Sequence, residues 1–91
     1  MDFQFFTNDR FKVLDCMYER QIDISGKKQV PLSQREIADI TGIAYKTVNN
    51  TIKALTSNGY ILREGTTRGK YALTNKADAV LLTIKKEGAQ R

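Results

Sequence analysis

The sequence predicts an α+β fold that is mainly helical, built as one domain over residues 1–91. Three observations predict it. Residues 33–58 hold two short helical patterns separated by a glycine, and residues 75–87 repeat apolar side chains at helical spacing. Between them, residues 60–74 contain two short strand-forming runs with glycines between them, which is typical of a hairpin. A chain of 91 residues can bury one modest core and not two.

The N-terminal third is expected to supply a core helix and a polar connection. Thr7 or Asn8 can cap a helix that continues to about Ile22. The apolar face of this helix would be formed by Phe11, Leu14, Tyr18 and Ile22. Residues 23–29 are expected to form a polar connector with a turn at Ser25 and Gly26. Residues 30–32 are expected to form a short extended segment at a sheet edge, because Pro31 cannot donate to a strand ladder.

The central helix pair has clear start and stop signals. Ser33 followed by Glu36 predicts a reciprocal capping box, and Gly42 predicts the left-handed residue that ends the first helix. A second helix is expected from about Ala44 to Asn58. Its buried face would be formed by Val48, Ile52 and Leu55, which follow one another at spacings of four and three.

The opposite face of the second helix carries no acidic residue. It presents Lys46, Asn50, Lys53 and Ser57, with Thr47 and Asn49 on its flanks. An ordinary solvated face mixes both signs of charge, whereas amides, hydroxyls and lysines bond base edges and phosphates. This face therefore favours nucleic acid as its partner.

The positive charge is concentrated in the same part of the chain. Residues 42–76 contain six basic residues and one acid, Glu64, which accounts for the whole net charge of +5. The basic residues are Lys46, Lys53, Arg63, Arg68, Lys70 and Lys76. Such a distribution suits phosphate binding.

Four residues carry a resemblance to a known family: Ala38, Gly42, Ile43 and Val48. They match the helix-turn-helix pattern, and the stretch VNNTIKALTSNGYI resembles the recognition helix and strand entry of winged helix-turn-helix regulators, the MarR and PadR groups in particular. The resemblance covers roughly residues 32–86. It implies a wing sheet of two to three strands, in which residues 30–32 pair with the wing, followed by a C-terminal helix.

The resemblance also implies sequence-specific binding of double-stranded DNA, by a transcriptional regulator that acts through operator occupancy. In the major groove, Asn49 or Asn50 would pair with adenine, and Lys46 or Lys53 with guanine or phosphate. The expected DNA-binding residues are Tyr45, Lys46, Thr47, Asn49, Asn50, Lys53, Arg63, Thr67, Arg68 and Lys70.

Two other functions remain open at this level. The domain could be an accessory protein of plasmid or phage replication or recombination, or a protein-interaction module. A partner or a second subunit could dock on Phe3, Phe5 and Phe6 together with Leu82 of the C-terminal helix, so a homodimer is a hypothesis.

Enzymatic activity is not expected. The chain has no histidine, no glycine-rich phosphate loop and no nucleophile elbow, and nothing indicates a metal site or a cofactor. Cys16 is the one cysteine; a structural thiol is favoured, with redox pairing across a dimer left open because Cys16 lies off the main apolar stripe. No apolar run reaches the roughly 20 residues that span a bilayer, and no secretory signal is visible, so a cytoplasmic protein is expected.

Overall fold

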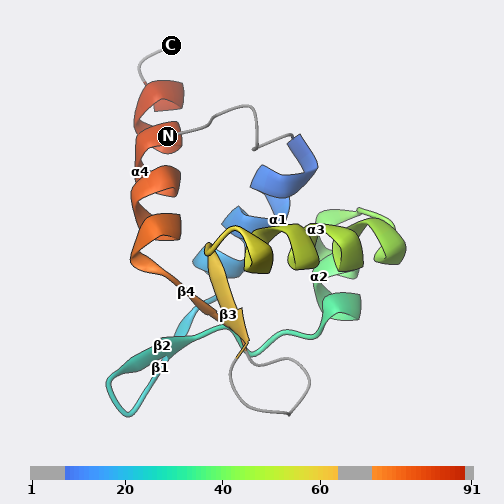
Figure 1. Ribbon diagram of the computed structural model, residues 1–91, viewed down its shortest axis with the longest axis horizontal. Helices are drawn as coiled ribbons and strands as arrows, with labels where there is room; N and C mark the ends of the chain where they lie inside the picture. Colours follow the sequence, from blue (N-terminus) through green and yellow to red (C-terminus); the bar gives the residue numbers. More distant parts are fainter. Residues whose placement is uncertain (1–7, 64–70, 90–91) are drawn as a thin grey trace.

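The computed structural model describes residues 8–63 and 71–89 and has the mainly helical α+β fold that the sequence predicts. Figure 1 shows the arrangement of its elements. In chain order they are α1 (Asn8–Glu19), β1 (Ile22–Ile24), β2 (Lys27–Gln29), α2 (Gln34–Thr41), α3 (Tyr45–Ser57), β3 (Ile61–Arg63), β4 (Tyr71–Leu73) and α4 (Asn75–Ala89).

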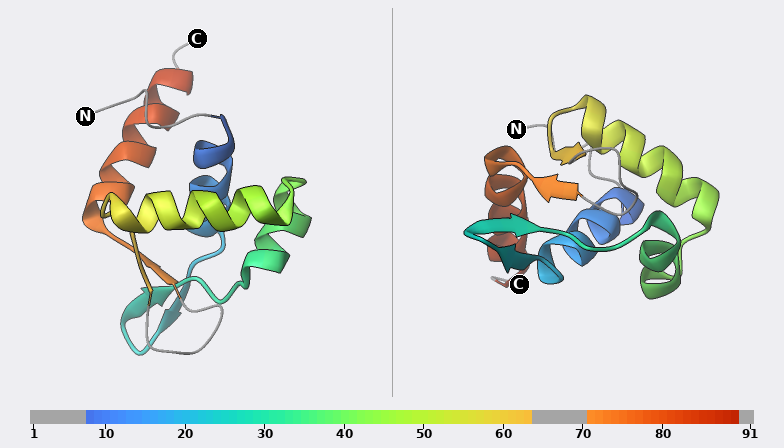
Figure 2. Two further views of the ribbon diagram at one scale, coloured as in Figure 1. Left: turned by 45° about the vertical axis from the view of Figure 1, so that its right-hand side comes forward. Right: turned by 90° about the horizontal axis from the view of Figure 1, so that it is seen from below.

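One apolar core lies between the helices. Helix α3 runs across the middle of the domain, crosswise to α4, with α1 behind it and the strands below (Figures 1 and 2). Each of the four helices and strand β3 contributes fully buried side chains to this core. They include Leu14 and Met17 from α1, Ile37 from α2, Val48 and Leu55 from α3, Ile61 from β3 and Leu81 from α4.

The connection after α1 differs from the prediction. Helix α1 ends at Glu19 and not at Ile22, and the expected polar connector is a β-hairpin in which Ile22 pairs with Gln29. Ile22 is 46% exposed and therefore takes no part in the core face assigned to it. Glu19, Arg20 and Gln21 are polar, so Ile22 is the one apolar side chain that a further turn would offer the core, and it pairs in the hairpin instead.

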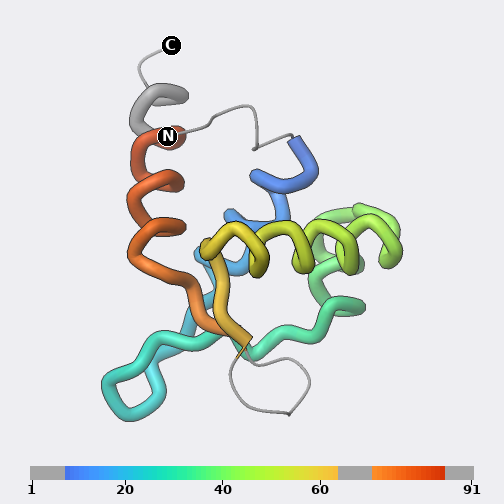
Figure 3. The backbone as a smooth tube through the Cα atoms, viewed as in Figure 1, coloured from blue at the N-terminus to red at the C-terminus, as the bar shows by residue number. Residues whose placement is uncertain are grey.

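The turn of this hairpin lies where the sequence predicts it. Ser25 and Gly26 have φ values of 53° and 83°, and two successive positive φ angles are the geometry of the two-residue turns that match strand twist. The Gly26 N–H donates to Asp23 Oδ1 at 2.9 Å. The hairpin projects from the body of the domain (Figure 3).

The wing strands pair as expected. Strands β3 and β4 are antiparallel, with Ile61 opposite Leu73. Val30 joins them through an isolated bridge to Tyr71, in which the Val30 N–H donates to the Tyr71 carbonyl oxygen at 2.8 Å. The extended segment at residues 30–32 therefore contacts the wing through Val30. The predicted wing tip, with Thr67, Arg68 and Lys70, lies outside the described residues, as do Phe3, Phe5 and Phe6.

Helix α4 closes the core. Thr74 Oγ1 accepts the Ala77 N–H at 3.2 Å and donates to the Gly59 carbonyl oxygen at 2.7 Å, so the predicted cap also ties α4 to the end of α3. Ala77, Val80 and Leu81 are buried, whereas Leu82 is 59% exposed. The helix was expected to end near residue 87 and continues to Ala89.

Cys16 is buried, with 6% of its surface exposed, although the sequence places it off the main apolar stripe of α1. Burial raises the pKa of its thiol, so the reactive thiolate is disfavoured. Helix α1 packs against α2, α3 and α4, and so its packed face is wider than one stripe. The structure supports the structural thiol and not a redox contact. In the part of the chain that the structure describes, no helix is long and apolar enough to cross a membrane.

Candidate nucleic-acid interface

The first helix of the central pair begins and ends as the sequence predicts. At its start, Ser33 Oγ accepts the Glu36 N–H at 3.1 Å, and Glu36 Oε1 accepts the Ser33 N–H at 3.0 Å. At its end, Gly42 has a φ of 74° and donates its N–H to the Ala38 carbonyl oxygen at 2.9 Å. Both signals are local, because each needs residues no more than four apart in the chain.

The turn between α2 and α3 is fixed by one threonine. Thr41 Oγ1 donates to the Ile37 carbonyl oxygen at 2.7 Å and accepts the Ile43 N–H at 3.3 Å. Ile43 packs against the core. These contacts set the direction in which α3 starts relative to α2.

Helix α3 buries the face that its apolar spacing predicts. Val48, Ile52 and Leu55 are buried, and so is Thr51, which the sequence analysis did not assign to this face. Ala44 provides no side-chain cap, so the first-turn N–H groups of α3 have no side-chain partner at that position. Such groups suit an anion.

The opposite face of α3 is exposed along its whole length. Lys46, Asn50, Lys53 and Ser57 are all exposed, and the helix contains no acidic residue. Thr47 lies half-buried at the edge of this row. Tyr45 is 48% exposed, and the Arg35 guanidinium lies 5.3 Å from the centre of its ring.

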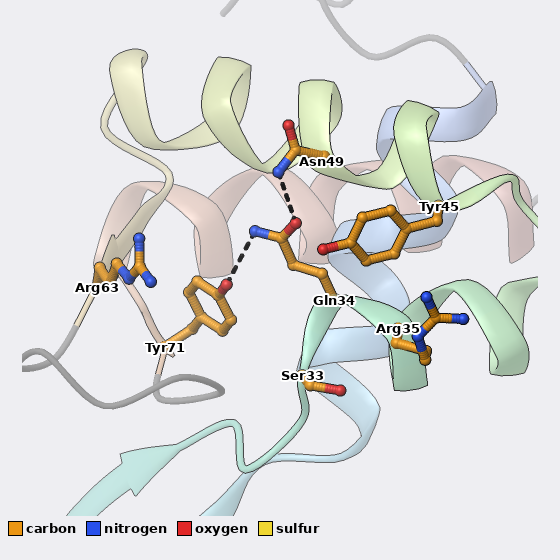
Figure 4. A pocket seen from close by; sticks show the side chains of 7 residues that line it. All are labelled: Ser33, Gln34, Arg35, Tyr45, Asn49, Arg63 and Tyr71. Carbon is orange, nitrogen blue, oxygen red and sulfur yellow. Dashed lines mark hydrogen bonds between the residues drawn. The ribbon is translucent and has the colours of Figure 1, made fainter.

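Asn49 lies in a different environment from Asn50. It is half-buried, and its Nδ2 donates to Gln34 Oε1 at 2.8 Å. Gln34 Nε2 in turn donates to the Tyr71 hydroxyl at 3.1 Å. Figure 4 shows this chain of hydrogen bonds, which joins α3, α2 and β4 and which no pattern in the sequence predicts.

A polar pocket opens beside this network, with a volume of about 470 Å³. It is lined by Ser33, Gln34, Arg35, Tyr45, Asn49, Arg63 and Tyr71. Among the described residues that line it, two carry guanidinium groups and none carries a carboxylate (Figure 4), which suits a phosphate. The fold thus brings Arg63 of the wing to the starts of α2 and α3, and it adds Arg35, whose only signal in the sequence is a basic residue in the first turn of α2.

One of the six basic residues of 42–76, Lys76, makes contacts within the fold. Lys76 Nζ donates to the Asn58 carbonyl oxygen at 2.8 Å and lies 4.5 Å from the centre of the Tyr60 ring. It stabilises the C-terminal end of α3, where a cation is favourable. Among the described residues, no group of three or more His, Cys, Asp or Glu side chains is placed to hold a metal ion.

Two helices joined by a tight turn, followed by a short hairpin and a closing helix, define a winged helix-turn-helix domain. The chain belongs to the Crp-like helix-turn-helix domain family, whose model matches residues 12–77. The narrower resemblance to the MarR and PadR groups is not confirmed, because the matching family is Crp-like. The helix-turn-helix pattern around Gly42 occurs in more than one group of regulators. The residues that form it therefore do not distinguish the MarR and PadR groups from the Crp-like family.

A solved structure has a similar fold: the reduced (Fe(II)) CO-sensing protein from R. rubrum. The two chains are 22% identical with a TM-score of 0.69, and the match covers 87% of this chain and 35% of the other. This chain therefore corresponds to about a third of that protein's length. No curated protein matches the sequence.

Proposed function

We propose that this domain binds double-stranded DNA sequence-specifically and regulates transcription by occupying an operator. The observation that carries the proposal is the exposed row on α3, Lys46, Asn50 and Lys53, on a helix without acidic residues. A row of this kind can approach a polyanion without repulsion and can bond base edges.

In this proposal α3 lies in the major groove. Asn50 pairs with an adenine edge, and Lys46 and Lys53 contact guanine or phosphate. Tyr45 and Thr47, near the helix start, hold the DNA backbone. On the wing, Arg63 and the residues of the tip, Thr67, Arg68 and Lys70, add phosphate contacts.

A homodimer would allow the protein to read two half-sites. Leu82 supports this, since it is 59% exposed on α4, whereas Ala77 and Leu81 of the same helix are buried. Phe3, Phe5 and Phe6 would extend the same contact. The CO sensing of the R. rubrum protein is not part of the proposal, because the similarity covers only 35% of that chain.

Selection from a pool of randomised duplexes tests the proposal. Repeated binding and amplification should enrich one motif, and a motif with two-fold symmetry would support the dimer. Affinity for the selected duplex should fall steeply as salt rises, because phosphate contacts release counterions. A pool that stays random after selection, with no shift of any duplex, would leave a protein-interaction module as the better account. If copies of the enriched motif in the genome lay at replication origins and not at promoters, the replication accessory would be favoured.

A further inference from the structure

We propose that Gln34 is a positioning residue that sets the angle between α3 and the wing, and that Asn50 and not Asn49 is therefore the amide that reads bases. The inference rests on the proposed DNA binding. It assigns different roles to two adjacent asparagines that the sequence does not distinguish: Asn50 contacts bases, and Asn49 bonds to Gln34.

The first step is the geometry of Asn49. Its Nδ2 is held by Gln34 Oε1 at 2.8 Å, and the residue is half-buried, whereas Asn50 is exposed. An asparagine that reads adenine uses its amide nitrogen and oxygen together, in one plane. Gln34 Oε1 accepts only one of the two Nδ2 hydrogens of Asn49, but this bond and the half-buried position hold the Asn49 amide toward α2. The exposed amide of Asn50 is therefore better placed to read a base.

The amide nitrogen of Gln34 is bonded to Tyr71. Tyr71 is 3% exposed, so its ring is fixed in the core, and its hydroxyl accepts from Gln34 Nε2 at 3.1 Å. Tyr71 also pairs with Arg63 across the wing and bridges Val30. The Tyr71 hydroxyl is therefore a fixed point at the base of the wing.

The third step is that these two bonds join elements far apart in the chain. Gln34 is 15 residues from Asn49 and 37 residues from Tyr71. One side chain at the start of α2 thus spans α3 and β4. Figure 4 shows it between the two, on the wall of the pocket that Arg35 and Arg63 also line. Both α3 and the wing must fit one duplex at the same time. Loss of the two Gln34 hydrogen bonds would let them shift relative to each other and so weaken that fit.

The chemistry of the bridge also suits its position. Amides and a phenol are neutral, so the network needs no buried charge and does not repel a phosphate in the pocket. A carboxylate at residue 34 could accept both bonds, from the Asn49 amide and the Tyr71 hydroxyl, but would place a negative charge there. The amide is the residue type that connects both partners without that charge.

The test uses Gln34→Met, which keeps the length of the side chain and removes both hydrogen bonds, and Tyr71→Phe, which removes only the hydroxyl. We expect either variant to reduce the ratio of affinities for the selected and a random duplex by roughly tenfold, on the scale of one lost positioning contact. Affinity for the random duplex should change little. The double variant should be no worse than the more affected single variant, because both remove the same network.

A purely structural role would instead lower the thermal stability and weaken both duplexes alike. Asn50→Ala in the same assay should lose the preference at one base pair, whereas Asn49→Ala should match Gln34→Met. An unchanged affinity ratio in both Gln34→Met and Tyr71→Phe would overturn the proposal.

A measurement on the free protein separates this inference from the function on which it rests. The side-chain amide signals of Asn49 in a proton–nitrogen NMR spectrum should be protected from exchange with water, and Gln34→Met should remove that protection. If the wild type binds no DNA, the proposed function fails, and Asn49 protection still reports on the network. Fast exchange of the Asn49 amide in the wild type would overturn the bridge whatever the DNA result.

Discussion

Asn49 and Asn50 show how a single step along a helix changes what a side chain can do. Each residue turns the helix by about 100°, so Asn50 faces solvent while Asn49 turns toward α2. The sequence places both near the reading face, and either could have been the reader. The partner that distinguishes them, Gln34, lies on another helix.

At the residue scale, we predict that Asn50→Ala lowers affinity for the selected duplex by about 1–3 kcal/mol and relaxes the preference at one base pair, because it removes a bidentate base contact. Titration of labelled duplexes with each base substituted in turn would measure it. Thr56→Ala, an exposed change on the same helix outside the row that faces DNA, is the control and should have little effect. An equal loss on selected and random DNA would assign base reading to another residue.

Gly42 gives a second prediction at this scale. Its φ of 74° lies in the left-handed region, and a Cβ added there would meet nothing within 4 Å, so the cost of Gly42→Ala comes from the backbone alone. We expect a loss of about 1–2 kcal/mol in the free energy of unfolding, measured by urea denaturation. Gly42→Asn is the matched variant and should lose less, because asparagine tolerates this conformation. Equal losses in the two variants would show that φ is not the cause.

At the element scale, the wing and the start of α2 meet at the pocket that holds Arg35 and Arg63. Neither element makes the pocket alone. β3 supplies Arg63 and α2 supplies Arg35, and the short strands bring them together because Tyr71 pairs with both Arg63 and Val30. Charges from separate elements thus form one surface.

We predict that Arg63→Ala weakens binding to all duplexes alike and reduces the slope of log affinity against log salt by about one unit, because one phosphate contact is lost. Binding isotherms over a range of salt concentrations would measure the slope. Lys12→Ala removes an exposed charge from α1, outside the proposed interface, and should leave the slope unchanged. If the two variants changed the slope equally, the effect would be one of net charge and not of position.

At the scale of the whole molecule, α1 and α4 are joined by a small charged cluster. Lys85 Nζ lies 2.8 Å from Asp15 Oδ1, also contacts Glu19 Oε1, and lies 4.9 Å from the centre of the Tyr18 ring. Hydrogen bonds to Asp15 and Glu19 raise the pKa of Lys85, and the bond from Lys85 lowers the pKa of Glu19. The cluster therefore links two helices from opposite ends of the chain, since Lys85 and Glu19 are 66 residues apart.

These shifts predict a pH dependence of stability. The contribution of Lys85 is complete below its ordinary pKa of 10.5 and is lost as pH rises through the higher folded value. The contribution of Glu19 is complete above its ordinary pKa of 4.5 and is lost as pH falls through the lower folded value.

Lys85→Met should therefore lower the melting temperature most between those limits, and the difference from the wild type should narrow at both ends. The effect is expected to be small, because the charged groups are partly exposed, and solvent and salt screen them. Thermal melts across pH would measure it, with Lys12→Met as the control for loss of one exposed charge. A difference that stayed constant from acid to alkaline pH would mean that packing of the Lys85 chain, and not its charge, joins the helices.

The sequence by itself determined the central helix pair, its caps and its buried faces, the wing strands and the closing helix. Those features arise from neighbours a few residues apart: the Ser33 and Glu36 box, the left-handed Gly42, and apolar residues at spacings of three and four. Tertiary structure alone decided that Cys16 is buried, that Arg35 meets Arg63, and that Asn49 turns inward. The physical reason is that local patterns fix which face of an element is apolar, whereas the partners of a polar side chain are set by how distant elements pack.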